Sequence, residues 1–397
     1  MLGVHELHEL GFTGKGIRIA VFDDGFTNVD SINGFQHLNV VYQKDLVDND
    51  NDVFGPCEGG CSHGTEVLSV VAARDSLLTG AAPDAEYYLF RVENNQIEVR
   101  EEENMWAEAA RLADSLDVHI IQSSVGYLDF DDGFTYPLEQ RDGKTAPSSQ
   151  AAIQAARNGI LVVNGVGNVG TRGIVVPADA DSILSVGAVT SQHLVAAFSS
   201  RGPTGDGRLK PEVIALGSQV TVLDTNGIIA YRTGTSFSSP LIAGLAACLW
   251  QAAEACGVQT DAMFVREAIM FSGHLNSNPG NGYGYGIPDA RIAFGYLTNK
   301  ALGNSGIDFP LSQIIVWPNP SSNEAYLSIK INRPVTSLMI EIFDQTGSKR
   351  LWQTREFTQP DVTKIINLPD LDYAGQYFIR VSDKDGLQLA STIWVRR

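Results

Sequence analysis

Residues 17–25 read Ile-Arg-Ile-Ala-Val-Phe-Asp-Asp-Gly, an apolar, β-branched run that ends in two carboxylates and a glycine. This run predicts a buried strand over residues 17–22, with Asp23 at its carboxyl end. Further segments alternate in the same way, with strands over residues 87–92, 118–123, 160–163 and 183–189 and helices over residues 102–116 and 150–157. Strands that alternate with helices predict an α/β fold, a parallel sheet with helices on both faces.

The pattern changes after residue 310. Short strand-like runs follow one another there, separated by turns that contain Gly, Pro and Asp. They predict a small all-β domain of the Ig-like sandwich type. We therefore expect a first domain over residues 1–302, a linker over 303–309 and a β-sandwich over 310–397.

The net charge also differs between the two predicted parts of the chain. The 397 residues carry a net charge of −18, but residues 1–309 hold 18 basic and 37 acidic residues (−19), and residues 310–397 hold 10 and 9 (+1). An acidic chain is a poor partner for nucleic acid, because phosphate binding needs Lys and Arg. The longest apolar run, residues 241–253, is too short to span a membrane and predicts a buried helix.

Four polar residues stand where parallel strands end or helices begin. Asp23 follows the first strand, His63 opens a helical run, Asn168 lies in a glycine-rich turn after a strand, and Ser236 precedes an apolar helix. Each has an ordinary structural interpretation when taken alone: a turn Asp, a capping His, a Gly/Asn turn and a Ser N-cap. Ligand sites of such sheets nevertheless lie at the carboxyl ends of the strands.

Taken together, these residues occur in a specific order and in specific motifs. His63-Gly64-Thr65 and Gly234-Thr235-Ser236-Phe237-Ser238-Ser239-Pro240 are joined by Ser124-Val125-Gly126, Phe198-Ser199-Ser200 and Lys210-Pro211-Glu212. Over roughly residues 7–296 the chain resembles the subtilisin-like serine peptidases (subtilases). The resemblance implies a secreted serine endopeptidase that hydrolyses peptide bonds in proteins through an acyl-enzyme.

The resemblance also implies roles. Ser236 would be the nucleophile, His63 the general base, and Asp23 the carboxylate that orients His63. Asn168 and the backbone N–H of Ser236 would bind the oxyanion. Substrate would bind along two segments, made up of Ser124, Val125 and Gly126, and of Gly165, Val166 and Gly167.

Three positions depart from the common subtilase pattern. Glu66 follows His63-Gly64-Thr65, so we expect an altered local charge without loss of the chemistry. Val169 stands at the rim of the primary specificity pocket, and Val175 or Val176 would narrow its floor. We therefore expect small or medium apolar side chains at P1.

No cofactor is expected for the chemistry. Residues 45–52 alternate oxygen ligands in a way that suits Ca²⁺, with Asp48, Asp50 and Asp52 as candidates. A second acidic cluster comprises Asp129, Asp131 and Asp132. For both loops, the alternative is an ordinary solvated surface.

Four cysteines are too few for a disulfide scaffold. Cys57 and Cys61 are close enough in sequence for a short loop disulfide. Cys248 and Cys256 lie in or beside one helix, about 12 Å apart if that helix is continuous, so we expect two buried free thiols.

The C-terminal part has its own resemblance. Trp317-Pro318-Asn319-Pro320, Gly375-Gln376-Tyr377 and the basic end Arg396-Arg397 are similar to the type A sorting domains of the Bacteroidetes type IX secretion system. This implies recognition by that machinery and a secreted or cell-surface location. A generic β-sandwich binding module is the alternative.

The start of the chain lacks the expected export features. Met1-Leu2-Gly3-Val4-His5 has neither a basic nor an apolar signal region, so neither signal peptide nor propeptide is expected within this chain. We expect a monomer acting on protein substrates. The rival hypotheses are a catalytically silent subtilase-like surface or binding protein, and a processing peptidase with one substrate.

Overall fold

The computed structural model describes most of the chain and divides it into two compact units, Met1–Leu297 and Thr298–Arg397. The described residues are 1–57, 60–301, 313–317, 326–330, 337–344, 349–356, 363–368, 375–383 and 388–396. The expected linker, residues 303–309, lies outside them, and the boundary at residue 302 stays a prediction.

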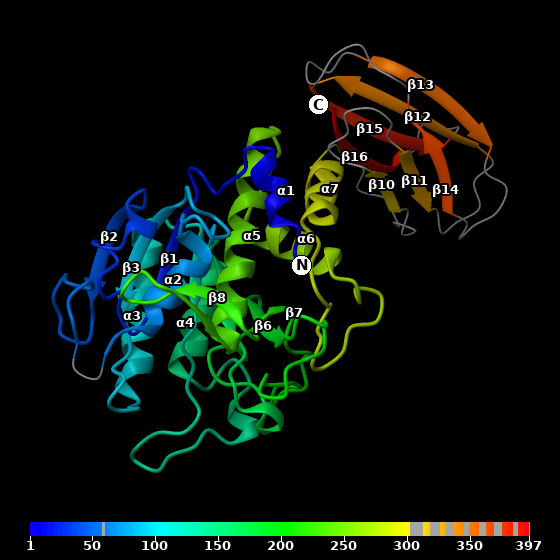
Figure 1. Cartoon of the computed structure of the whole chain (residues 1–397). Helices are drawn as coiled ribbons and strands as arrows, with labels where there is room; N and C mark the ends of the chain where they lie inside the picture. Colours follow the sequence, from blue (N-terminus) through cyan, green and yellow to red (C-terminus); the bar gives the residue numbers. More distant parts are fainter. Residues whose placement is uncertain are drawn as a thin grey trace. The chain divides into compact units, whose positions relative to one another are not determined.

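A parallel sheet of seven strands forms the centre of the first unit, in the order β2-β3-β1-β4-β5-β6-β7 (Figure 1). Its strands are β1 (Arg18–Asp23), β2 (Asn39–Asp45), β3 (Glu86–Arg91), β4 (Ile120–Ser123), β5 (Leu161–Gly165), β6 (Leu184–Val189) and β7 (Val213–Leu216). The predicted α/β class is confirmed. Strand order reverses between β1 and β4, and open parallel sheets bind ligands at such a switch point.

Helices cover both faces of this sheet because each buried strand is apolar on both sides. Phe22 of β1 packs edge-on against Trp106, with ring centroids 5.4 Å apart, on the face that α3 and α4 cover. On the other face Tyr87 of β3 donates from its hydroxyl to the carbonyl of Val71 in α2. The helices are α1 (Val4–Glu9), α2 (His63–Ala72), α3 (Glu101–Ser115), α4 (Pro147–Arg157), α5 (Thr235–Ala255), α6 (Ala262–Ser272) and α7 (Ala290–Ala301).

The long helix α5 differs from the expectation. It begins at Thr235, six residues before the predicted apolar run, and includes Pro240 in its second turn. Its N-terminal end is rich in small residues, which allows a close approach to the sheet: Ser239 lies within hydrogen-bonding distance of carbonyl oxygens of both β4 and β5. A two-stranded hairpin, β8 (Val220–Leu223) with β9 (Ile229–Arg232), precedes it.

The second unit contains two antiparallel sheets, β10-β11-β14 and β13-β12-β15-β16. Its strands are β10 (Gln313–Trp317), β11 (Tyr326–Lys330), β12 (Ser337–Asp344), β13 (Lys349–Glu356), β14 (Thr363–Asn367), β15 (Gly375–Asp383) and β16 (Gln388–Arg396). This confirms the small all-β domain. Among the described residues, no helix combines the length and the apolarity that a membrane span requires.

Candidate active site

Asp23 and His63 meet at the carboxyl end of the sheet. Asp23 ends β1 and is fully buried, whereas His63 opens α2 and keeps 35% of its side chain exposed. The His63 Nδ1 lies 2.6 Å from Asp23 Oδ1. A carboxylate accepts the proton of Nδ1, so Nε2 is left to exchange a proton with a substrate or a nucleophile.

Close packing of α2 on β1 explains the glycine that follows His63. A Cβ on Gly64 would clash with the carbonyl oxygen of Gly25 and lie 2.9 Å from the Asp23 Cβ. Only glycine therefore allows the start of α2 to come within hydrogen-bonding distance of the end of β1.

Electrostatics favour the protonated imidazole. Burial opposes the charged ring, but the negative charges of Asp23, Asp24 and Glu93 outweigh it and raise the pKa of His63 above its ordinary value. Asp24 is buried beside Asp23, and desolvation together with that neighbouring charge raises the pKa of Asp24 to about 6. An imidazolium formed during a reaction would be stabilised here.

Ser236 lies in the first turn of α5, and the residue after it contacts His63. The ring centroids of His63 and Phe237, the residue after Ser236, are 5.7 Å apart. Ser236 Oγ donates to the carbonyl of Ser124 at 3.4 Å, and Ser124 Oγ donates to the carbonyl of Ser236 at 2.8 Å. Ser236 is thus held between α2 and the segment after β4, at the positive end of a 21-residue helix.

Asn168 faces the same place. Its Oδ1 accepts from the backbone N–H of Thr235 at 2.9 Å and from the Thr235 hydroxyl at 3.1 Å. These bonds fix the amide so that Nδ2, which has no hydrogen-bond partner within the described part of the chain, is the group left for a ligand. Nδ2 also lies next to Gly234, 3.6 Å from where a Cβ of that residue would be.

A groove of about 230 Å³ brings most of the predicted substrate residues together. Ser124, Val125, Gly126, Gly165 and Gly167 line it, with Asn168, Val169 and Ser236. Val166 does not line it; its side chain is fully buried against Ile174 and Ala178. Neighbouring side chains of an extended segment point to opposite sides, so Val166 faces away from the groove that Gly165 and Gly167 line.

Val175 fills the space between the two backbone walls of the groove. A Cβ on Gly126 would lie 2.5 Å from Val175 Cγ2, and one on Gly167 would lie 2.6 Å from Val175 Cγ1. Val176 is fully buried and exchanges backbone hydrogen bonds with Tyr127. Of the two candidates for the floor, Val175 is therefore the one that reaches the groove.

Four further residues line the groove that the sequence did not place there: Glu98, Leu128, Thr235 and Asp129, which was predicted only as part of an acidic cluster. Burial and the neighbouring carboxylates, with Glu102 first among them, raise the pKa of Glu98 to about 7. Nothing local in the sequence points to Glu98, because the fold brings it from the loop before α3. For Thr235 the sequence does offer a signal, because this residue directly precedes the predicted nucleophile Ser236.

Side chains of the two acidic loops have partners within the protein, and the expected calcium sites stay a prediction. Asp48 pairs with Arg91 at 2.6 Å, and one oxygen each of Asp50 and Asp52 accepts backbone N–H groups of its own loop. In the second cluster Asp129 pairs with Arg172 at 2.7 Å. Among the described residues, the one group of three acidic or histidine side chains that could share an ion is Asp23, Asp24 and His63.

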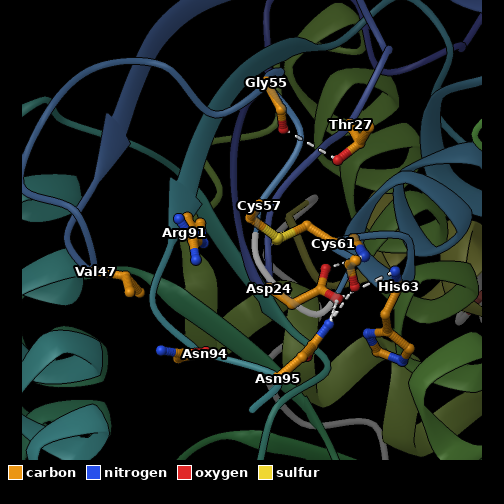
Figure 2. The surroundings of a disulfide bond; sticks show 12 residues. Asp24, Thr27, Val47, Gly55, Cys57, Cys61, His63, Arg91, Asn94 and Asn95 are labelled. Atoms are coloured by element: carbon orange, nitrogen blue, oxygen red, sulfur yellow. Dashed lines mark hydrogen bonds between the residues drawn. A yellow bond between two sulfur atoms is a disulfide. The ribbon is translucent and has the colours of Figure 1, made fainter.

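The extra carboxylate Glu66 and the four cysteines can each be placed. Arg232 of β9 binds both oxygens of Glu66, at 2.6 and 2.8 Å, so the extra carboxylate is neutralised. Cys57 and Cys61 form a disulfide close to Asp24 and His63 (Figure 2). Cys248 is a buried free thiol as expected, but Cys256 is exposed, because it lies just beyond the end of α5.

Comparison with known proteins agrees with this geometry. Residues 14–286 match the family model described as the subtilase family, peptidase S8, and residues 315–396 match the secretion system C-terminal sorting domain. The human membrane-bound transcription factor site-1 protease is 29% identical over 247 residues, which is 60% of this chain and 21% of that protein. Subtilisin E of Bacillus subtilis strain 168 is 29% identical over 252 residues, 61% of this chain and 58% of that protein.

A solved structure shares the fold. The prenylagaramide maturation protease PagA superposes with a TM-score of 0.59 at 23% identity and covers 75% of this chain and 100% of its own. The chain spans about a fifth of the length of site-1 protease and just over half of subtilisin E. The family match covers more than half of the sequence, so the chain belongs to the subtilase family of serine proteases and has a C-terminal secretion system sorting domain.

Proposed function

We propose that this protein is a secreted serine endopeptidase that hydrolyses peptide bonds through an acyl-enzyme on Ser236. The observation that carries the proposal is the meeting of three features at the groove and at the start of α5 beside it. These are the Asp23–His63 pair at 2.6 Å, the Ser236 hydroxyl in the first turn of α5, and the Asn168 amide turned by Thr235.

Each group has one task in the proposed reaction. Ser236 Oγ attacks the carbonyl carbon while His63 Nε2 takes its proton, and Asp23 stabilises the resulting imidazolium. The Asn168 Nδ2–H and the Ser236 backbone N–H donate to the oxyanion. His63 returns the proton to the leaving amine as the C–N bond breaks, and a water molecule then releases the acyl group by the same steps.

The groove suits small side chains at P1. The Val175 side chain occupies the space between Gly126 and Gly167, which leaves little depth for a large residue. Ser124–Gly126 would pair with an extended substrate backbone as an added strand. We therefore propose protein substrates cleaved after small or medium apolar residues, by a monomer that needs no metal for the chemistry.

Export is proposed from the second unit. A secretion system sorting domain matches residues 315–396, which supports recognition by type IX machinery and a secreted or cell-surface location. The Cys57–Cys61 disulfide is consistent with that location, because disulfides persist in oxidising compartments.

The test is proteolysis of unfolded casein by the purified full chain. Ser236→Ala should lower kcat by roughly 10⁶-fold, since the nucleophile is lost while the groove remains. Ser191→Ala, on an exposed turn, is the matched control and should keep full activity. If the folded wild type leaves casein intact, the silent surface or binding protein is favoured; if it cleaves one site only, a dedicated processing peptidase is favoured.

A further inference from the structure

The disulfide loop directly before His63 takes no part in the reaction described above. Cys61 is buried two residues before His63 and packs on the turn that follows Asp23 and Asp24. A Cβ on Gly25 of that turn would lie 2.8 Å from the Cys61 Cβ and 3.2 Å from its sulfur. The disulfide therefore lies against the backbone that joins the catalytic carboxylate to the next element (Figure 2).

Asn95, from the loop after β3, connects this disulfide loop to the buried Asp24. Its Nδ2 donates to Asp24 Oδ2 at 2.6 Å and to the Gly60 carbonyl, beside Cys61, at 2.6 Å. The two protons of one amide nitrogen account for both bonds. Figure 2 shows the Asn95 side chain pointing toward Asp24, on the side of Asp24 that faces away from the disulfide.

Asp24 in turn holds the first residues of α2. Its Oδ1 accepts from the Gly64 backbone N–H at 2.8 Å, and its Oδ2 accepts from the His63 backbone N–H at 3.3 Å. Asp24 is 1% exposed, so its charge depends on these donors rather than on water. The Ser62 side chain makes no capping bond, so this carboxylate from the neighbouring turn acts as the N-terminal cap.

These contacts form one continuous path from the disulfide to the catalytic base. We propose that Asn95 and the Cys57–Cys61 disulfide act together as a positioning brace, which holds Asp24 against the start of α2 and so fixes His63 toward Asp23 and Ser236. This inference rests on the proposed function. Asn95 is a positioning residue in it, since it contacts neither the nucleophile nor the groove described above.

The brace makes a quantitative prediction for single variants. Asn95→Ala removes both donors and should lower kcat for a peptide substrate about 10- to 100-fold, because a small displacement of the base costs that much. KM should stay unchanged, because the groove residues are untouched. The matched control is the neighbouring variant Asn94→Ala. The Asn94 side chain accepts from the backbone N–H of Gln96 in its own loop, so this variant should keep the wild-type kcat.

A combined variant tests whether Asn95 and the disulfide act on the same path. Cys57→Ala with Cys61→Ala should lower kcat by a similar factor, and adding Asn95→Ala should lower it no further, because the path is already broken. Asn95→Asp keeps the shape but replaces the donor with an acceptor, and should lower kcat at least as much as Asn95→Ala.

The outcomes separate the brace from the proposed function. Wild-type cleavage of casein that Ser236→Ala abolishes establishes the function independently of the brace. A wild-type kcat in folded Asn95→Ala or Asn95→Asp would overturn the brace, as would a rise in KM alone. Losses that multiply in the combined variant would also overturn it, since Asn95 and the disulfide would then act separately.

Discussion

The Val175 side chain lies between Gly126 and Gly167 and limits the depth of the groove. Val175→Gly would open the space between Gly126 and Gly167 and admit large apolar side chains at P1. We expect kcat/KM for a peptide with Phe at P1 to rise about 10- to 100-fold, as apolar burial at that size is worth about 1–3 kcal/mol.

The measurement is mass spectrometry of a peptide library after digestion. Val169→Gly, which removes a valine from the rim and not from the floor, should leave the size preference unchanged. An unaltered preference for small P1 residues in Val175→Gly would contradict the assignment of Val175 as the floor.

Glu93 acts by charge on His63, the proposed general base. Burial, with the charge of Asp23, raises the pKa of Glu93 well above its ordinary value, so Glu93 carries a negative charge only above that raised pKa. When Glu93 is ionised, its charge adds to those of Asp23 and Asp24 and raises the pKa of His63, which must be neutral to accept a proton. Where Glu93 is ionised, Glu93→Gln should therefore lower the pKa of His63 and shift the acid limb of kcat/KM to lower pH, by a few tenths to about one unit.

A pH profile of peptide cleavage measures this shift. Glu108→Gln is the control, because Glu108 pairs with Arg111 on the surface of α3. An acid limb that stays in place, or moves to higher pH, would show that Glu93 does not act on His63 in this way.

At the scale of elements, a buried ion pair holds β7 to its neighbours. Lys210 Nζ contacts both oxygens of Glu212, at 2.8 and 3.1 Å, and Glu212 also accepts from the Ser185 hydroxyl of β6 at 2.6 Å. Burial raises the pKa of Glu212, but Lys210 and Arg266 outweigh it, so the pKa lies below its ordinary value of 4.5.

Glu212→Gln should lower the free energy of unfolding by about 3–5 kcal/mol at neutral pH, because it leaves the Lys210 ammonium buried without its counter-ion. The wild-type contribution is present above pH 4.5, the unfolded value, and is lost as the pH falls through the lower folded pKa. Urea unfolding at pH 7 and pH 3 measures both effects. A loss below about 1 kcal/mol at pH 7, as for an exposed pair, would contradict this role.

At the scale of the whole molecule, the two units differ in chemistry as well as in fold. The negative charge lies almost entirely in residues 1–309, while residues 310–397 are close to neutral. Removal of residues 310–397 would therefore leave a chain with a net charge of −19, slightly more negative than the −18 of the full chain. The proposed division of labour is that the first unit cleaves and the second directs export.

The sequence predicted most of the sheet and its helices because buried strands and amphipathic helices have local signatures. It missed β13, which reads Lys-Arg-Leu-Trp-Gln-Thr-Arg-Glu, because charged residues dominate that strand and little apolar alternation is left. It also missed β2, whose half-exposed residues at the edge of the sheet mix polar and apolar side chains.

Site residues that belong to sequence motifs could be predicted, whereas residues that reach the site through tertiary contacts could not. Asp23, His63, Asn168 and Ser236 stand in motifs, and the fold brings them to one edge of the sheet. Asn95 has no motif, and its role depends on two bonds to residues more than 30 positions away.

The most direct test of the central claim is covalent labelling of the folded full chain with a fluorophosphonate, followed by mass mapping of the modified peptide. We expect one adduct per molecule, on Ser236, and none in Ser236→Ala. Folded protein that resists labelling, or an adduct that persists in Ser236→Ala, would contradict it.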